Sequence, residues 1–256
     1  MLRNRVIPVL LVKDHGLVKT TRFANPKYVG DPINAIRIFN EKEVDELALL
    51  DISATRGSQG PNFELVQDVA SECFMPLAYG GGIRGIEDAK RLFGLGVEKV
   101  VLRSAAMANL RTVTAIADFA GSSSVTVSID VRRTKFGRQQ LYCPDAPRHG
   151  ESDWSGFLTR AVEAGAGEII LNAVDRDGTM AGMDTDLISV AARTTTVPLV
   201  AVGGVGSLAH IKAGVHSGAD AIGAGAFFVY HGPRRAVLIT YPRHDELASL
   251  LGTADD

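Results

Sequence analysis

The chain has 256 residues, of which 46% are hydrophobic and 22% charged, so it can bury a large core and has the usual length of one α/β barrel. Its formal net charge of −2 offers no broad attraction for nucleic acid or an anionic membrane, so a polyanion would have to bind at a local site. No apolar run approaches the roughly 20 residues of a membrane span, and Pro8 interrupts the short apolar start, which makes a poor signal peptide. We expect a cytoplasmic protein with no nucleic-acid or membrane partner.

Two cysteines, Cys73 and Cys143, stand apart in the sequence, without a CxxC pattern or a histidine cluster at metal-ligand spacing. This arrangement argues against a structural zinc and fits a reduced compartment. We therefore expect two incidental thiols, no metal site and no cofactor.

Short apolar runs rich in Val, Ile and Leu alternate with amphipathic stretches along the whole chain. The runs predict strands over residues 6–11, 47–52, 76–79, 100–103, 125–130, 169–173, 199–202 and 221–224. The amphipathic stretches predict helices over residues 32–42, 62–73, 86–95, 110–119, 153–164, 184–193 and 208–217. Continuous apolar strands indicate a parallel sheet that is covered on both faces.

Eight strands alternating with seven clear helices predict the α/β class and a single (β/α)8 TIM barrel over residues 1–242. A doubly wound open sheet is the structural alternative. Residues 243–256 form a polar C-terminal tail that we expect to be frayed.

An internal repeat favours the barrel over the open sheet. The segment "PLAYGGGIRGIEDAKRLFGLGVEKVVLRSA" from Pro76 lies over "PLVAVGGVGSLAHIKAGVHSGADAIGAGAF" from Pro198 without a gap, at an offset of 122 residues. The same offset places Glu46 on Glu168, so the duplication extends beyond one motif. Two duplicated half-barrels build an eightfold barrel, whereas an open sheet gives no reason for such symmetry.

Glycine loops follow the third and seventh predicted strands, as "YGGGI" and "VGGVGS". In a (β/α)8 barrel the site forms at the C-terminal ends of the strands, and phosphates often bind at loops after late strands. Glycines allow backbone N–H groups to approach an anion closely. Strands four and eight end in the small residues of "LRSAA" and "GAGAF". We expect two phosphate sites that hold a ligand with a phosphate at each end, although each Gly-Gly alone is typical of a plain turn.

Acidic residues follow two further strands on the same rim. Asp130 ends an otherwise apolar strand, and the pairing of "RVIPVLLV" with "SVTVSIDV" places Leu11 at the equivalent point of the first strand. A partly desolvated carboxylate has a raised pKa that suits acid–base chemistry, but Asp130 can also simply cap the next loop. In "NAVDRDGTMAGMD", Asp175 and Asp177 either pair the intervening arginine, bind a ligand hydroxyl or close an Asx turn.

Four longer motifs give a family resemblance: "GDPINAIRIFNEKEVDELALLDI", "YGGGIRGIEDAKRL", "GAGEIILNAVDRDGTMAGMD" and "VGGVGSLAHI". Over residues 3–228 the chain resembles the cyclase subunit of imidazole glycerol phosphate synthase, from the histidine-biosynthesis family of duplicated barrels. The resemblance implies that ammonia from a separate HisH-like glutaminase travels through the barrel to a bisphosphorylated substrate. It also implies that two aspartates, at the ends of strands one and five, carry out the acid–base chemistry.

The resemblance assigns site residues. It gives Asp130 and Lys19 as catalytic residues. It places the substrate phosphates near Gly81, Gly82, Arg103, Ser104, Asp177, Gly178, Gly203, Gly204, Gly225 and Ala226. It implies an ammonia gate at the N-terminal mouth of the barrel, formed by Arg5, Glu46, Lys99 and Glu168. On the residues alone, these four charges indicate a stabilising salt-bridge network, because opposite charges can neutralise one another where isolated ones would be costly to bury.

Three departures from the family pattern bear on function. Leu11 stands where the resemblance implies the first catalytic aspartate, and a leucine cannot transfer a proton. Arg103 replaces a smaller polar residue, so its charge either clamps another anion or blocks the usual substrate. The ending "FFVYHGPRRAVLITYP" differs from the amphipathic last helix of the usual subunit.

The residues "LLV" and this ending resemble a divergent branch found with surface-polysaccharide (lipopolysaccharide) enzymes. The resemblance implies that the barrel and a glutaminase supply ammonia to a third enzyme, a sugar amidotransferase that forms an acetamidino group on an N-acetyl sugar. We place this role ahead of the authentic cyclase (lyase) of histidine biosynthesis. The related sugar isomerase of the same pathway needs both aspartates and is disfavoured by Leu11. The long basic segment 130–154 either covers the site, contacts a partner or forms a solvated hairpin.

Overall fold

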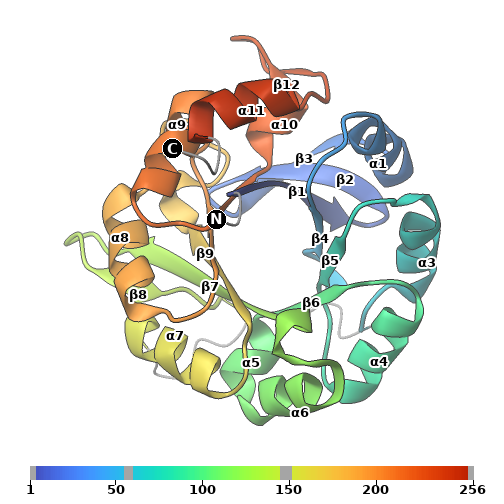
Figure 1. Cartoon of the computed structure of the whole chain (residues 1–256), viewed down its shortest axis with the longest axis vertical. Coiled ribbons are helices and arrows are strands. Elements are labelled where there is room, and N and C mark those ends of the chain that lie inside the picture. The colour runs from blue at the N-terminus through green and yellow to red at the C-terminus, as the bar shows by residue number, and fades with distance from the viewer. Residues whose placement is uncertain (1–3, 55–59, 145–151, 253–256) are drawn as a thin grey trace.

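In the computed structural model, which describes residues 4–54, 60–144 and 152–252, eight parallel strands close into a barrel (Figure 1). The barrel strands are β1 (Arg5–Lys13), β4 (Leu47–Asp51), β5 (Leu77–Gly80), β6 (Lys99–Leu102), β7 (Val125–Arg133), β9 (Glu168–Ala173), β10 (Leu199–Val202) and β11 (Ala221–Ala224). Each strand pairs in parallel with the next one around the barrel, and β11 pairs back with β1. This closure confirms the predicted (β/α)8 barrel and excludes the open sheet.

Helices surround the barrel, as Figure 1 shows. The seven predicted ones are α1 (Pro32–Glu41), α3 (Phe63–Glu72), α4 (Ile86–Gly94), α6 (Arg111–Ala120), α7 (Trp154–Glu163), α8 (Thr185–Thr194) and α9 (Leu208–His216), each within one residue of its predicted ends. Five begin at a side chain that accepts a hydrogen bond from a backbone N–H of the first turn: Asp31, Asn62, Asp153, Asp184 and Ser207. Within the described ranges, no helix is long and apolar enough to cross a membrane.

Smaller elements decorate the barrel. These are β2 (Gly16–Thr21), β3 (Ala24–Gly30), α5 (Ser104–Ala108), β8 (Gln139–Leu141), α10 (Ala226–Val229), β12 (Tyr230–His231), β13 (Ala236–Val237) and α11 (His244–Leu251). The sequence pattern did not predict them, because they lack the continuous apolar runs and the amphipathic periodicity of the barrel strands and outer helices. The hairpins β2–β3 and β7–β8 extend from β1 and β7, which are the first and fifth barrel strands.

The C-terminal segment departs from the sequence prediction. Residues 243–256 were expected to be frayed, but helix α11 forms within them. Its Leu247 is only 2% exposed, and the Arg243 backbone N–H donates to Glu246 Oε2 at 2.9 Å, which caps the start of the helix. Just before the helix, the Tyr241 hydroxyl donates to the Val6 carbonyl at 2.8 Å and ties this end of the chain to β1. One buried leucine among charged residues is a weak sequence signal, although it suffices to dock a short helix.

Alternating side chains on each strand build two separate cores. In β1, Val6 and Leu10 belong to a large cluster between barrel and helices, whereas Ile7 and Val9 belong to a small cluster inside the barrel. The rest of the inner cluster is Ala48, Ala78, Val101, Ile170, Val200 and Ala221. The polar residues of the strands lie at the two ends of the barrel. The inner apolar cluster therefore lies between a charged N-terminal mouth and a polar C-terminal mouth.

The internal repeat is present in the structure. The bounds of β5, α4 and β6 differ from those of β10, α9 and β11 by the same 122 residues found in the sequence. The strand register also supports the pairing of Leu11 with Asp130. Leu11 lies opposite Leu50, and Asp130 lies opposite Asn172, which is 122 residues after Leu50. Leu11 therefore occupies in the first half-barrel the position that Asp130 occupies in the second.

Candidate functional site

A cavity of about 900 Å³ lies at the C-terminal ends of the barrel strands. Its wall includes every predicted catalytic and phosphate-site residue: Lys19, Gly81, Gly82, Arg103, Ser104, Asp130, Asp177, Gly178, Gly203, Gly204, Gly225 and Ala226. The structure therefore brings these residues, spread over more than 200 positions of sequence, to one site. Their individual roles stay predictions.

The two glycine loops have backbone conformations that only glycine adopts without strain. Gly81 has a φ of +128°, and an added Cβ would lie 2.4 Å from the Asp51 carbonyl oxygen. Gly204 has a φ of +93°, and its Cβ would lie 2.1 Å from the Gly182 carbonyl oxygen. The backbone turn alone thus requires both glycines, whether or not a phosphate binds there. Both glycines line the cavity.

Replacing Gly204 with alanine is expected to lower the free energy of unfolding by about 1–3 kcal/mol, because the Cβ meets a backbone oxygen at a left-handed φ. Binding of sulfate as a phosphate probe is expected to weaken as well. Chemical unfolding and calorimetry measure the two effects. The matched control is Gly94→Ala on α4, where a Cβ meets nothing within 4 Å and the change should be neutral or mildly stabilising. Equal stability of the two variants would contradict the prediction.

Asp130 is buried at the centre of the site, with 3% of its surface exposed. Its Oδ1 accepts a hydrogen bond from Asn172 Nδ2 at 2.8 Å, and its Oδ2 pairs with Arg103 Nη1 at 3.2 Å. Burial raises the pKa of Asp130 above its ordinary value, while the Arg103 charge and the hydrogen bond from Asn172 lower it in part. The carboxylate is therefore tied to a guanidinium that itself lines the cavity, which makes it a poorer proton acceptor than an unpaired one.

Arg103 also contacts the start of α5, since its Nη2 donates to Ser104 Oγ at 3.2 Å. From the sequence, the Arg103 guanidinium either clamps an anion or blocks the usual substrate. The structure adds a contact that the sequence did not predict, because Arg103 directly follows β6, Asp130 lies on the adjacent strand β7, and the two meet only through side-chain orientation.

Lys19 is fully buried on β2, and its Nζ donates to the Val9 carbonyl at 2.6 Å. The amine faces Gly225 so closely that a Cβ there would lie 2.6 Å from it. Burial lowers the pKa of Lys19 to about 8, although the Asp177 charge raises it in part. The amine therefore changes its charge close to neutral pH, in the wall of the cavity.

Lys19 gives a prediction about pH. Sulfate, whose charge is constant in this range, should bind about tenfold more weakly at about pH 9 than at about pH 7, because the amine loses its proton around pH 8. The free energy of unfolding should rise with pH between 8 and 10.5, since the unfolded chain then binds the extra proton. Calorimetric titrations and denaturation curves test both effects. Lys19→Met should abolish the pH trend in binding, and Lys90→Met, at an exposed lysine of α4, should not.

Asp177 lines the cavity, and its place in a phosphate site stays a prediction. Its Oδ2 accepts hydrogen bonds from the Thr20 hydroxyl at 2.7 Å and from the Phe23 backbone N–H at 3.0 Å, both on the β2–β3 hairpin. Asp175 is likewise engaged, because it accepts from the Arg133 backbone N–H at 2.6 Å. A carboxylate by itself repels a phosphate, so a phosphate near Asp177 would need compensating donors from the loop backbone. Asp177 also fixes the hairpin against the rim of the cavity.

The two long hairpins meet over the cavity. Phe23 of β2–β3 and Tyr142 after β8 pack edge to face, with ring centroids 6.2 Å apart, and both line the cavity. These hairpins arise from opposite strands of the barrel, so their contact spans its mouth. Neither aromatic residue was predicted from the sequence, because single aromatic residues in polar loops belong to no recognisable motif. Of the segment 130–154, only Asp130, Tyr142 and Pro144 line the cavity within the described residues, so the three alternatives for this segment stay open, and residues 145–151 lie outside the described part of the chain.

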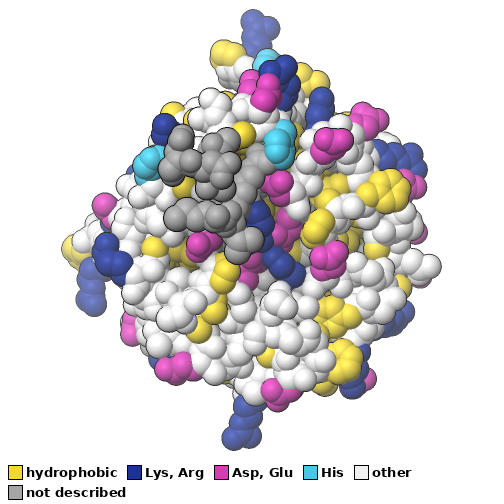
Figure 2. All heavy atoms as spheres, in the orientation of Figure 1, with side chains coloured by type: hydrophobic (Ala, Val, Ile, Leu, Met, Phe, Trp, Pro, Cys, Tyr) yellow, Lys and Arg dark blue, Asp and Glu magenta, His cyan; other side chains and the backbone are white. Residues whose placement is uncertain are grey.

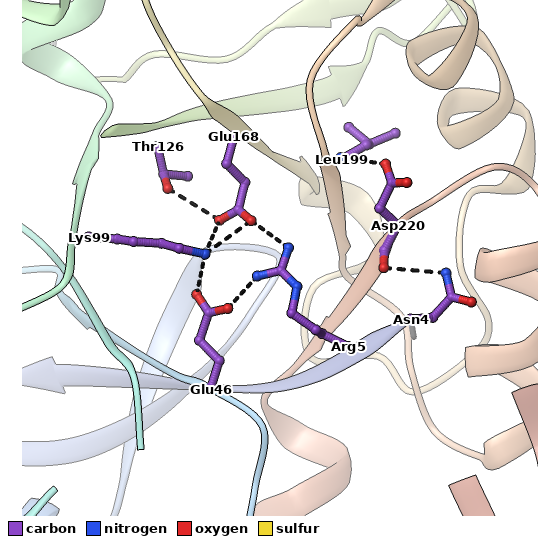
Figure 3. A network of polar contacts seen from close by, with 8 residues as sticks. All are labelled: Asn4, Arg5, Glu46, Lys99, Thr126, Glu168, Leu199 and Asp220. Atoms are coloured by element: carbon purple, nitrogen blue, oxygen red, sulfur yellow. Dashed lines mark hydrogen bonds and ion pairs between the residues drawn. The ribbon is translucent and has the colours of Figure 1, made fainter. Parts of the chain in front are cut away.

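Four charges form a closed network at the opposite, N-terminal mouth (Figure 3). Lys99 Nζ lies 2.9 Å from Glu46 Oε1 and 3.2 Å from Glu168 Oε1, and Arg5 pairs with both glutamates. The glutamate side chains are only 5% and 6% exposed. Burial lowers the pKa of Arg5, but Glu168 and Glu46 together raise it above its ordinary value. We call these four residues the charged ring.

The charged ring sits where the resemblance implied a gate. Figure 2 shows dark blue and magenta side chains gathered near the centre of the face that is turned to the viewer. The ring is a salt-bridge network, as the sequence alone indicated. Its members lie at the N-terminal ends of β1, β4, β6 and β9, with the apolar inner cluster between them and the cavity. This geometry is compatible both with a purely stabilising salt-bridge network and with an ammonia gate.

Neither metal nor disulfide chemistry is indicated by the described residues. In ranges 4–54, 60–144 and 152–252, no group of three or more His, Cys, Asp or Glu side chains is placed to hold a metal ion. Cys73 and Cys143 are free thiols.

The fold and the position of the cavity define a (β/α)8-barrel protein whose ligand site lies at the C-terminal ends of its strands. Residues 5–233 match the family model described as "Histidine biosynthesis protein". The chain belongs to this family, and the family predicted from the sequence is confirmed.

Relatives of the chain carry related names. It is 51% identical over 248 residues to the "putative imidazole glycerol phosphate synthase subunit hisF2" of Pseudomonas aeruginosa, covering 96% of this chain and 99% of the relative. It is 45% identical to a protein of the same description, "hisF3", of Vibrio vulnificus, covering 96% and 95%. It is 37% identical to the "imidazole glycerol phosphate synthase subunit HisF" of Streptococcus sanguinis, covering 90% and 91%.

Proposed function

We propose that the protein is a HisF-like barrel that receives ammonia from a partner glutaminase and supplies it for amidation of an N-acetyl sugar, forming an acetamidino group in surface-polysaccharide biosynthesis. The partners are a HisH-like glutaminase, in a heterodimer, and a third enzyme, the sugar amidotransferase. The observation that carries the proposal is the C-terminal site itself. Leu11 fills the position equivalent to Asp130, and Asp130 is paired with Arg103.

Imidazole ring formation needs proton transfers, and this site offers few groups for them. Leucine cannot transfer a proton, and pairing with a guanidinium reduces the basicity of the remaining carboxylate. Loss of one acid–base group costs about 10²- to 10⁴-fold in rate. Passage of neutral ammonia needs no acid–base group. The altered site therefore argues against cyclase activity and does not affect ammonia delivery.

The barrel axis supports ammonia passage. The charged ring closes the N-terminal mouth, and the inner cluster beyond it contains small side chains such as Ala48, Ala78 and Ala221. An apolar path favours neutral ammonia over ammonium, because a charge is costly to move into apolar surroundings. Glutaminase docking at this mouth would release ammonia into the barrel rather than into water.

An authentic cyclase is the second candidate function. It would convert phosphoribulosylformimino-AICAR-phosphate and ammonia to imidazole glycerol phosphate and AICAR in histidine biosynthesis. The name of the streptococcal relative favours it, as do Asp130, Lys19 and the two glycine loops in one cavity. The phosphates would then lie against two sets of residues. One set is Gly81, Gly82, Arg103 and Ser104, and the other is Asp177, Gly178, Gly203, Gly204, Gly225 and Ala226.

The two functions separate in a purified system of barrel, glutaminase and sugar amidotransferase. With free ammonium and the phosphoribosyl substrate, the barrel alone should form imidazole glycerol phosphate at least about 100-fold more slowly than an ordinary cyclase. With glutamine and the N-acetyl sugar, the three-protein mixture should form the acetamidino product, and omission of the barrel should abolish it. Cyclisation at an ordinary rate would overturn the proposal.

A further inference from the structure

The β7–β8 hairpin is a rigid projection with an unusual tip. Beyond the barrel wall, Val131, Arg132 and Arg133 pair with β8, and the tip is closed by the Thr134 N–H donating to the Arg138 carbonyl at 2.8 Å. The Thr134 hydroxyl oxygen also accepts from the backbone N–H of Phe136 at 3.3 Å. In Figure 1 the hairpin runs outward past α8 at the left edge of the molecule. Its tip is therefore held by backbone bonds while it stands clear of the helices.

Side chains at the base lock the hairpin in place. Arg133 binds Asp184 through two nitrogens, with Nε and Nη2 at 3.1 and 2.8 Å from Oδ2. The Arg132 guanidinium lies 3.9 Å from the centre of the Tyr142 ring. Because Asp184 also caps α8, the hairpin is tied to the outer helix layer and to the cavity wall together.

Phe136 at the tip is 93% exposed, and the side chains of Lys135 and Arg138 beside it are exposed as well. The segment 131–144 contains four cations and no carboxylate. Figure 2 shows hydrophobic and basic side chains protruding together at the corresponding edge. An aromatic ring on a preorganised support loses little conformational entropy on binding, which is why aromatic and basic residues dominate interface anchors.

We propose that Phe136, with Lys135 and Arg138, docks a protein partner that presents an apolar pocket rimmed by carboxylates, and that this partner is the sugar amidotransferase. The identity of the partner rests on the proposed function. The hairpin continues β7 beyond Asp130 and so leaves the barrel at the cavity end, where ammonia would emerge. A glutaminase feeding the charged ring would sit at the other end of the barrel. The positive charge of the tip selects an acidic partner surface.

Photo-cross-linking tests this assignment in living cells of the source organism. Phe136 is replaced by p-benzoylphenylalanine in the full chain, and the same replacement at Phe119, a half-exposed ring on α6, serves as the control. The expected result is an adduct at position 136, absent at 119, whose peptides identify a sugar amidotransferase. An adduct with the glutaminase or with a second copy of the chain would overturn the proposal, as would equal labelling at both positions.

Purified proteins supply the second measurement. Phe136→Ala should weaken binding of the sugar amidotransferase by about tenfold or more, and Phe136→Tyr should retain most of the affinity. Charge reversal at Lys135 and Arg138 should slow association and reverse its salt dependence, because attraction to an acidic surface becomes repulsion. Unchanged affinity in Phe136→Ala would contradict the docking site. If the proposed function is wrong, the unaltered chain gives no acetamidino product. If only the docking site is wrong, the product forms and Phe136→Ala binds the sugar amidotransferase as tightly as the unaltered chain.

Discussion

Replacing Lys99 with methionine is expected to lower the free energy of unfolding by about 3–5 kcal/mol, because the change leaves two buried glutamates with one cation between them. Glu46 and Glu168 are almost fully buried, so water cannot replace the lost ammonium. Methionine keeps the length and apolar stem of lysine. Chemical denaturation measures the effect. Charge reversal at Lys99 would be a poorer choice, since it would place three carboxylates together and confound folding with transport.

A neutral pair of changes separates the structural and transport roles of the charged ring. Lys99→Met with Glu46→Gln removes one charge of each sign, leaves Arg5 paired with Glu168, and should recover most of the lost stability. If the charged ring admits ammonia, this folded double variant should still let the glutaminase hydrolyse glutamine but should release more of the ammonia to solvent. Full coupling of glutamine use to product in that variant would assign the ring to stability alone. Ammonia release and product formation are measured in the same reaction.

The elements that the sequence predicted well are those with long, regular patterns. Continuous apolar runs gave the barrel strands, and 3.6-residue periodicity gave the seven outer helices, because each pattern reports burial on a fixed side of a regular element. The repeat strengthened this prediction by requiring matching halves. Helix α11 and the β12–β13 hairpin were not predicted. The segment between them is tied to β1 by the hydrogen bond from the Tyr241 hydroxyl to the Val6 carbonyl, a contact between distant parts of the chain that no local pattern reports.

The candidate site was predicted as a set of residues but not as an arrangement. Strand ends and glycine loops indicated which residues reach the cavity, since topology alone brings them to one rim. The Arg103–Asp130 pair and the Asp177–Thr20 hydrogen bond depend on side-chain orientation, which no periodicity reports. The resemblance named the charged ring, whereas the closed pattern of its contacts comes only from the structure. The side-chain contacts of the structure were therefore needed to design variants that test the chemical roles of these residues.

Combining Leu11→Asp with Arg103→Asn is expected to raise ammonia-driven formation of imidazole glycerol phosphate by about 10²- to 10⁴-fold over the unaltered chain. The first change returns a carboxylate to the position equivalent to Asp130, on the cavity wall. The second frees Asp130 from its guanidinium partner and shortens a side chain beside the Ser104 loop. Each change alone should give much less, because catalysis needs both groups. Product formation from free ammonium and the phosphoribosyl substrate is measured directly, without a glutaminase.

The matched control places the new carboxylate one strand away. Leu50 lies opposite Leu11 in the register and also lines the cavity, so Leu50→Asp with Arg103→Asn adds the same charge at nearly the same depth. It should not raise cyclisation, because general acid–base catalysis depends on where the carboxylate stands relative to the reacting atoms. A gain in the control would show that any added carboxylate suffices. A folded Leu11→Asp, Arg103→Asn variant without a gain would show that these two residues are not what separates this barrel from a cyclase, and would direct attention to the altered segment after β11.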